Sequence, residues 1–182
     1  EDIVYEGEYT VLGDGRIVVN NRFIVPEGTP PLARVGMRTV LPASFNQLEW
    51  YGKGPHESYI DRGESAFVGL YNGTVEEQHF PHVMPQENGN KMDVRWLSLS
   101  SGDQSVRFSG MPLINFNVQD YSAEALNESK TSHELKRGEN TYLHIDFQQM
   151  GLGGDNSWQP RVHREYLLQQ SEYEYSFSIL AR

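Results

Sequence analysis

The sequence predicts an all-β fold, a sandwich of antiparallel sheets with one short helix. Several short segments alternate apolar and polar residues, which is the pattern of half-buried strands. The clearest example is residues 172–179, where Tyr173, Tyr175, Phe177 and Ile179 alternate with Glu172, Glu174, Ser176 and Ser178. Clusters of Gly, Pro and Asn separate these segments, and 17 Gly and 9 Pro do not suit a helical bundle.

Taken in order, residues 2–25 are expected to form a hairpin, because Gly13-Asp14-Gly15 supplies a turn between two alternating segments. Three prolines make 26–33 a loop. Further strands are expected over 35–41, around 48–51, over 66–75, within 92–118, over 143–147, over 162–168 and over 172–179. Ser122 is a suitable N-cap for a short helix that runs to about Lys130.

Composition and charge exclude several function classes. The chain has 182 residues and a formal charge of −10 without any basic cluster, which disfavours binding to nucleic acid or to an anionic membrane surface. It has no cysteine, and no apolar run approaches the roughly 20 residues that span a bilayer. We expect one domain over residues 1–182. Because the sequence begins within an expected strand, we expect it to be the C-terminal portion of a longer chain, with the domain continuing on the N-terminal side.

The loop over residues 148–160 is the most unusual stretch. Three glycines in four positions, Gly151, Gly153 and Gly154, do not suit the interior of a strand or helix. The short polar residues Asp155, Asn156 and Ser157 favour local turns, and Trp158 follows them. A tryptophan held on such a loop is suited to contact the face of a ligand. The alternative is that Trp158 closes one end of the sandwich core.

Candidates for catalysis are present by residue type only. Glu87 and Asp155 lie on loops, but their spacing does not show that they form the carboxylate pair of a glycosidase. Glu87 with a histidine would suffice for a sugar epimerase, with His133, His144 and His163 as candidates. His79 and His82 are a weak zinc pair, because Pro81 between them prevents a regular helix, and a hydrogen-bonded loop histidine is favoured instead.

An ordered series of motifs resembles the C-terminal domain of the large bacterial β-galactosidases of glycoside hydrolase family 2. The motifs are Arg34-Val35-Gly36, residues 49–62 (EWYGKGPHESYIDR), Pro85-Gln86-Glu87-Asn88-Gly89, His133-Glu134-Leu135, Asp146 and residues 151–158 (GLGGDNSW). They cover most of the chain in the order of the family. His56 and Ser58 stand where the family often has other polar residues, so the resemblance assigns them no role.

The resemblance implies a galactose-mutarotase-like supersandwich in a bacterial hydrolase that cleaves terminal β-D-galactosides such as lactose. The catalytic carboxylates of the family lie in a separate TIM-barrel domain, so no catalytic residue, metal or cofactor is expected here, and any Mg or Na requirement belongs to the barrel. The resemblance also implies that Trp158, with Asp155, Asn156 and Ser157, contributes to a sugar-binding wall. The implied partners are a galactoside, the barrel and other domains of the parent, and further copies of the parent in a homo-oligomer.

Three hypotheses therefore stand beside one another. The first is a non-catalytic domain that supports the sugar site of a β-galactosidase and is inactive alone. The second is an autonomous aldose 1-epimerase that uses Glu87 and His133. The third is a purely structural or oligomerisation domain with Trp158 in its core. The sequence leaves the cellular compartment of the bacterial parent open.

Overall fold

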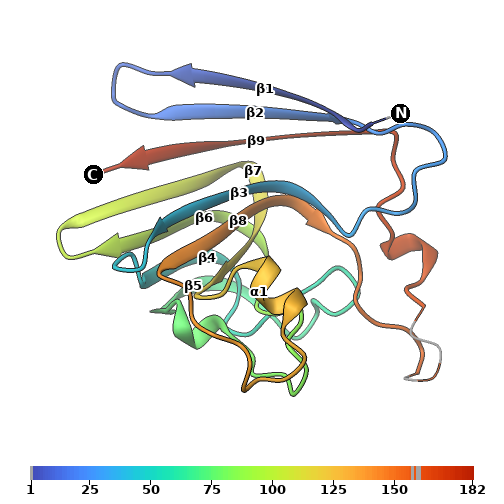
Figure 1. Cartoon of the computed structure of the whole chain (residues 1–182). Coiled ribbons are helices and arrows are strands. Elements are labelled where there is room, and N and C mark those ends of the chain that lie inside the picture. Colours follow the sequence, from blue (N-terminus) through green and yellow to red (C-terminus); the bar gives the residue numbers. More distant parts are fainter. Residues whose placement is uncertain (1, 157, 159–160) are drawn as a thin grey trace.

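The computed structural model describes residues 2–156, 158 and 161–182, and it confirms an all-β fold with one short α-helix (Figure 1). The strands are β1 (Val4–Val11), β2 (Ile17–Ile24), β3 (Arg34–Pro42), β4 (Gln47–Gly54), β5 (Phe67–Thr74), β6 (Lys91–Ser101), β7 (Gln104–Gln119), β8 (Asn140–Gln149) and β9 (Glu172–Ala181). The helix is α1 (Ala123–Glu128), and two single-turn 3-10 helices are η1 (Glu76–Gln78) and η2 (Arg164–Tyr166).

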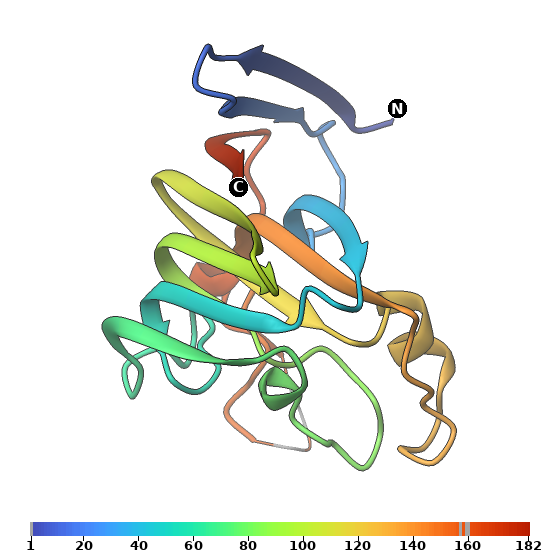
Figure 2. The same cartoon turned by 90° about the vertical axis from the view of Figure 1, so that its left-hand side faces the viewer.

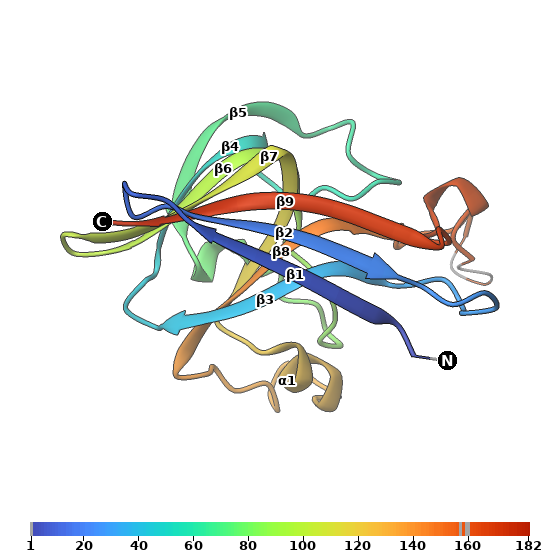
Figure 3. The same cartoon turned by 90° about the horizontal axis from the view of Figure 1, so that it is seen from above.

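All strand pairs are antiparallel, and the nine strands belong to one hydrogen-bonded sheet. Its main path runs β1-β2-β9-β7-β6-β4-β5, and β8 joins it beside β7 and carries β3 on its other side. Figure 3 shows β9, β2 and β1 running next to one another, with α1 on the side of the molecule away from β5. The sheet therefore folds over itself to give the layers of a sandwich.

Strand β7 makes this folding possible because it pairs with different neighbours along its length. Its first part, Val106–Met111, pairs with β9, and its last part, Asn115–Gln119, pairs with β8. Between them Gly110 lies so close to the backbone of Leu113 and Ile114 that an added Cβ would come within 2.8 Å of it. In Figure 2 the β1–β2 hairpin stands apart from the layer that contains β6 and β7.

The main core lies between the layers and follows the predicted alternation. Its buried side chains come from every strand except β1 and β5, and the largest is Trp50, which packs against Tyr71 and Phe116. The predicted inward faces of the last two strands are confirmed: Leu143 and Ile145 of β8 and Tyr175 and Phe177 of β9 are buried. Strand β1 is exposed along its whole length.

The predicted helix is confirmed, although it is shorter than expected and ends at Glu128. The Ser122 hydroxyl caps it by accepting a hydrogen bond from the backbone N–H of Ala125 at 3.1 Å. With six residues, α1 is far too short to cross a bilayer, and no other helix among the described residues has the length and apolar character to do so.

The predicted strand over 162–168 is wrong. This segment contains η2, and only Leu168 makes a bridge, to Leu32 in the loop that follows β2. A strand needs a neighbour along its length, and here the backbone N–H of Tyr166 instead bonds to the carbonyl of His163 at 3.0 Å. Leu168 is buried against Val25 and Tyr173 in a small second core, which explains why the segment has an apolar residue at that place.

Candidate functional site

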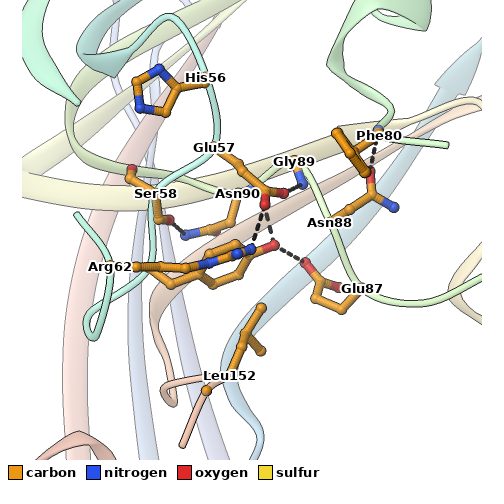
Figure 4. Close-up of polar contacts among 12 residues, drawn as sticks. His56, Glu57, Ser58, Arg62, Phe80, Glu87, Asn88, Gly89, Asn90 and Leu152 are labelled. Atoms are coloured by element: carbon orange, nitrogen blue, oxygen red, sulfur yellow. Dashed lines mark hydrogen bonds and ion pairs between the residues drawn. The ribbon is translucent and has the colours of Figure 1, made fainter. Parts of the chain in front are cut away.

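Two of the motifs that are separated in sequence meet in the fold. The turn over residues 55–62 follows β4, and it packs against the loop over residues 85–90 that precedes β6 (Figure 4). The backbone N–H of Ser58 donates to the carbonyl of Asn90 at 2.8 Å, and the Asn90 side chain returns a 2.8 Å bond to the carbonyl of Ser58. These reciprocal bonds join two irregular segments whose backbone groups have no strand partner.

Glu57 connects the same two segments by charge. Its Oε2 accepts a 2.7 Å hydrogen bond from the backbone N–H of Gly89, and its Oε1 forms an ion pair with Arg62 (Figure 4). The Arg62 guanidinium lies 5.0 Å from the centre of the Tyr59 ring, which is fully buried. Burial, with the charges of Glu87 and Glu57, raises the pKa of Tyr59, so its hydroxyl stays protonated and can donate.

Glu87 lies at the centre of a polar network rather than on a free loop. Its Oε1 is 3.0 Å from Arg34 Nη2 and accepts hydrogen bonds from Asn117 at 2.9 Å, Gln149 at 3.3 Å and the Tyr59 hydroxyl at 3.5 Å. These donors come from β3, β7, β8 and the turn after β4. A carboxylate oxygen that is shared by so many internal donors is suited to hold the fold in place.

Arg34 also pairs with a fully buried carboxylate on the adjacent strand. Its Nε lies 3.1 Å from Oδ2 of Asp146, which has no exposed surface. Burial raises the pKa of Asp146 to about 8, against the opposing effect of the Arg34 charge. Gly36 leaves the space that Asp146 needs, because an added Cβ would come within 2.0 Å of Asp146 Oδ1. In the Arg34-Val35-Gly36 motif, Arg34 therefore provides the cation that pairs with Asp146, and Gly36 provides the space for the Asp146 side chain.

The loop that contains Gly151, Gly153 and Gly154, called the glycine loop below, begins at the end of this network. Asp61 Oδ2 accepts hydrogen bonds from the backbone N–H groups of Leu152 at 2.8 Å and Gly153 at 2.7 Å. Gly151 donates to the carbonyl of Tyr166 at 2.9 Å. An open cleft of about 460 Å³ lies beside the loop; its lining includes Asp61, Arg62, Gly153, Gly154, Asp155, His163, Glu165 and Tyr166.

Trp158 is 92% exposed, so it is not a core residue and the core-plug alternative is wrong for this chain. Its backbone N–H donates to Oδ1 of Asn156 at 2.9 Å, which is the local turn bond expected of that residue type. Asp155 Oδ1 lies 2.7 Å from Nε2 of His163, and this contact raises the pKa of His163. Ser157, the fourth predicted sugar-site residue, lies outside the described residues.

The other candidate residues have separate partners. Among the described residues the polar partners of Glu87 do not include Asp155 or His133. Asp155 contacts His163 instead, and His133 lies exposed in the segment between α1 and β8.

The remaining histidines have structural surroundings. His79 Nδ1 lies 3.0 Å from Oε1 of Gln119, so it is the hydrogen-bonded loop histidine that was expected. His144 is half-buried between β3 and β7, and burial lowers its pKa to about 4. His56 Nε2 lies 3.0 Å from the Ser65 hydroxyl, and its ring is on the far side of the turn from Glu87 (Figure 4). Within the part of the chain that the structure describes, no cluster of three or more His, Asp or Glu side chains is suited to a metal ion.

Sequence reasoning did not identify Asp61 as a site residue, although it lies in one of the motifs. A signal was present: Asp61 and the glycine loop belong to the same ordered motif series, and consecutive N–H groups in a glycine-rich turn commonly surround an anion. The contact spans 91 residues along the chain, which alternation and turn patterns do not reveal.

Comparison with known proteins agrees with this arrangement of motifs. The family described as "Beta galactosidase small chain" matches residues 2–179. The chain is 40% identical over 171 residues to a β-galactosidase of Vibrio cholerae, which covers 94% of this chain and 16% of that protein. It is 37% identical over 162 residues to a β-galactosidase of Priestia megaterium, covering 88% of this chain and 16% of that protein.

A third relative, a β-galactosidase of Pseudoalteromonas haloplanktis, is 35% identical and matches 94% of this chain. In all three cases the chain spans only about 16% of the relative's length. With nearly the whole sequence matched by one family, the chain belongs to the β-galactosidase small chain family.

Proposed function

We propose that the chain is a non-catalytic part of a β-galactosidase, in which Trp158 forms part of the wall of the galactoside site. The observation that carries the proposal is an indole that is 92% exposed on a loop whose base is tied to the fold by Asp61. A soluble domain gains no stability from an exposed indole of this size, whereas a sugar ring presents an apolar face that such a ring covers well.

The proposed energetic contribution is moderate. Covering part of the indole with a sugar ring removes apolar area from water, which is worth on the order of 1–2 kcal/mol. Asp155, Asn156 and Ser157 belong to the same wall in this proposal, with Asp155 and Asn156 also shaping the loop through His163 and the Trp158 backbone. Bond cleavage is assigned to carboxylates in the barrel part of the complete enzyme, and that enzyme is proposed to act on terminal β-D-galactosides such as lactose.

The first test compares Trp158→Ala and Trp158→Phe in the complete β-galactosidase that contains this chain. We expect Trp158→Ala to raise KM for a nitrophenyl galactoside about 5- to 30-fold, the equivalent of 1–2 kcal/mol, and Trp158→Phe to raise it less. Trp96→Phe is the matched control, because Trp96 lies on β6 with Arg107 stacked over its ring and belongs to no part of the loop. An unchanged KM in Trp158→Ala would contradict the proposed wall.

The second test uses the 182-residue chain alone. We expect no hydrolysis of the nitrophenyl galactoside above a blank, because the proposal assigns bond cleavage to carboxylates in the barrel part of the complete enzyme. Turnover that persists after repurification and is lost on Glu87→Gln would instead place catalysis within this chain.

A further inference from the structure

Asp61 holds the start of the glycine loop with a single carboxylate oxygen. Its Oδ2 accepts from the consecutive N–H groups of Leu152 and Gly153 at 2.8 and 2.7 Å. Hydrogen bonds to an ionised acceptor are shorter and about twice as strong as those between neutral groups. Two such bonds at neighbouring residues fix the direction in which the chain leaves β8, as well as its position.

The turn that carries Asp61 is itself firmly supported. The backbone N–H of Arg62 closes the turn on the carbonyl of Tyr59 at 3.0 Å, and the Tyr59 ring is buried beneath the Arg62 guanidinium. The Arg62–Glu57 ion pair then links the turn to the backbone of Gly89. Asp61 therefore projects from a platform that is anchored in the polar network around Glu87.

The loop has little room to shift at its base. A Cβ added to Gly151 would lie 2.9 Å from Cγ of Asp61 and 2.9 Å from Cβ of Tyr166, so the backbone is enclosed on both sides. Just before it, the N–H of Met150 donates to the carbonyl of Ala33 at 3.0 Å. Figure 4 shows Leu152 close below the turn that carries Arg62. Trp158 lies only a few residues beyond this enclosed base.

We infer that Asp61 is a positioning residue for galactoside binding, one that sets the place of Trp158 without touching the sugar. The inference rests on the proposed function, because it assigns Asp61 a role only through Trp158. It differs from a general stabilising role in one measurable respect: removal of Asp61 weakens galactoside binding mainly through Trp158, so its effect is small once Trp158 is removed.

A double-mutant cycle in the complete enzyme tests this. We expect Asp61→Ala to raise KM about 3- to 10-fold, which is less than Trp158→Ala, with a smaller effect on kcat. We expect the double variant to lie close to Trp158→Ala alone, because the two changes act mainly on the same contact. Asp103→Ala is the matched control, since Asp103 lies exposed on the turn between β6 and β7.

Hydrogen exchange measured by mass spectrometry on the same enzymes reports on the anchor directly. We expect peptides that cover residues 150–156 to exchange faster in Asp61→Ala, while peptides from β9 keep the wild-type rate. Asp61→Asn keeps an acceptor oxygen without its charge, so it should give an intermediate rate and an intermediate KM. This variant also keeps the test decisive if Asp61→Ala folds poorly.

The possible failures can be told apart. If Trp158→Ala leaves KM unchanged, the proposed function fails, and the positioning role fails with it. If Trp158→Ala raises KM but Asp61→Ala does not, or the loop exchanges at its wild-type rate in Asp61→Ala, only the inference about Asp61 is overturned. It is also overturned if Asp61→Ala multiplies KM by the same factor in the Trp158→Ala background.

Discussion

Arg34 Nε and Asp146 Oδ2 lie 3.1 Å apart on the paired strands β3 and β8, and the Asp146 side chain has no exposed surface. Removal of Arg34 is costly because the buried Asp146 carboxyl loses its counter-charge and must then either keep a proton or stay charged without a partner. We expect Arg34→Met to lower the free energy of unfolding of the chain by about 3 kcal/mol in urea titrations. Arg38→Met is the control on the same strand, because its pair with Glu124 is exposed, and it should shift the midpoint little.

The pH dependence of that variant follows from the same contact. The folded-state pKa of Asp146 is already raised to about 8 by burial, and Arg34 opposes the rise. Without Arg34 the pKa rises further, so the folded state keeps a proton that the unfolded state releases near pH 4. Stability of Arg34→Met should therefore fall as pH increases from 5 to 8, and the added Asp146→Asn change should remove most of this slope. A slope that remains in the double variant would contradict the assignment to Asp146.

The two tryptophans Trp158 and Trp50 should differ sharply in their effect on stability. Trp50 is 1% exposed and its Nε1 donates to the carbonyl of Lys53 at 2.9 Å, so Trp50→Ala should cost about 3–5 kcal/mol. Trp158→Ala should leave the thermal midpoint of the isolated chain within experimental error, because its ring is exposed. Differential scanning calorimetry of both variants checks this. A large loss in Trp158→Ala would restore the core role.

Gly151 and Gly153 offer a steric comparison within one loop. A Cβ at Gly151 meets Asp61 and Tyr166 at 2.9 Å, whereas a Cβ at Gly153 meets Asp61 Oδ2 at an ordinary 3.5 Å. We expect Gly151→Ala to lower the free energy of unfolding by about 1–3 kcal/mol and Gly153→Ala to be nearly neutral. Urea midpoints of the two variants measure this difference, and equal midpoints would show that the base of the loop is less confined than its contacts indicate.

His163 should titrate above the ordinary range because of Asp155. Its pKa is raised first by the hydrogen bond and charge of Asp155 and secondly by Glu165. The contribution of this pair is complete below the unfolded-state pKa and is lost as pH rises through the folded-state pKa of His163. In NMR titrations Asp155→Asn should lower the His163 pKa, and Glu165→Gln should lower it less. The reverse order would contradict the 2.7 Å contact.

The strands could be predicted because alternation and turn chemistry are local. Three features follow from residues that are close together in the sequence: the hairpin at Gly13–Gly15, the inward face of β9 and the Ser122 cap. The predicted strand over 162–168 is wrong because the apolar residues of this segment are typical of a strand, but only Leu168 forms a strand-like bridge.

The site was predictable only in part. The exposed, turn-bound Trp158 agrees with a loop chosen for its glycines and short polar residues. The network that holds this loop was hidden, because Arg34, Asp61, Glu87 and Asp146 are far apart in the chain and no periodic pattern links them. The sequence shows that a motif contains a polar residue. Which group becomes its hydrogen-bond or ion-pair partner is decided only when the whole sheet has formed.

The position of β9 has a consequence for how the chain reaches its final form. The β1–β2 hairpin forms from neighbouring residues, but among the described residues it pairs with the rest of the sheet through β9, and the bond between Ser176 and Asn20 joins residues 156 positions apart. Loop closure over such a distance must precede any gain from pairing, which slows folding. The hairpin should therefore form early as a separate unit and join the rest of the sheet late. Until β9 pairs with it, the edge of β2 stays open to pairing with other strands.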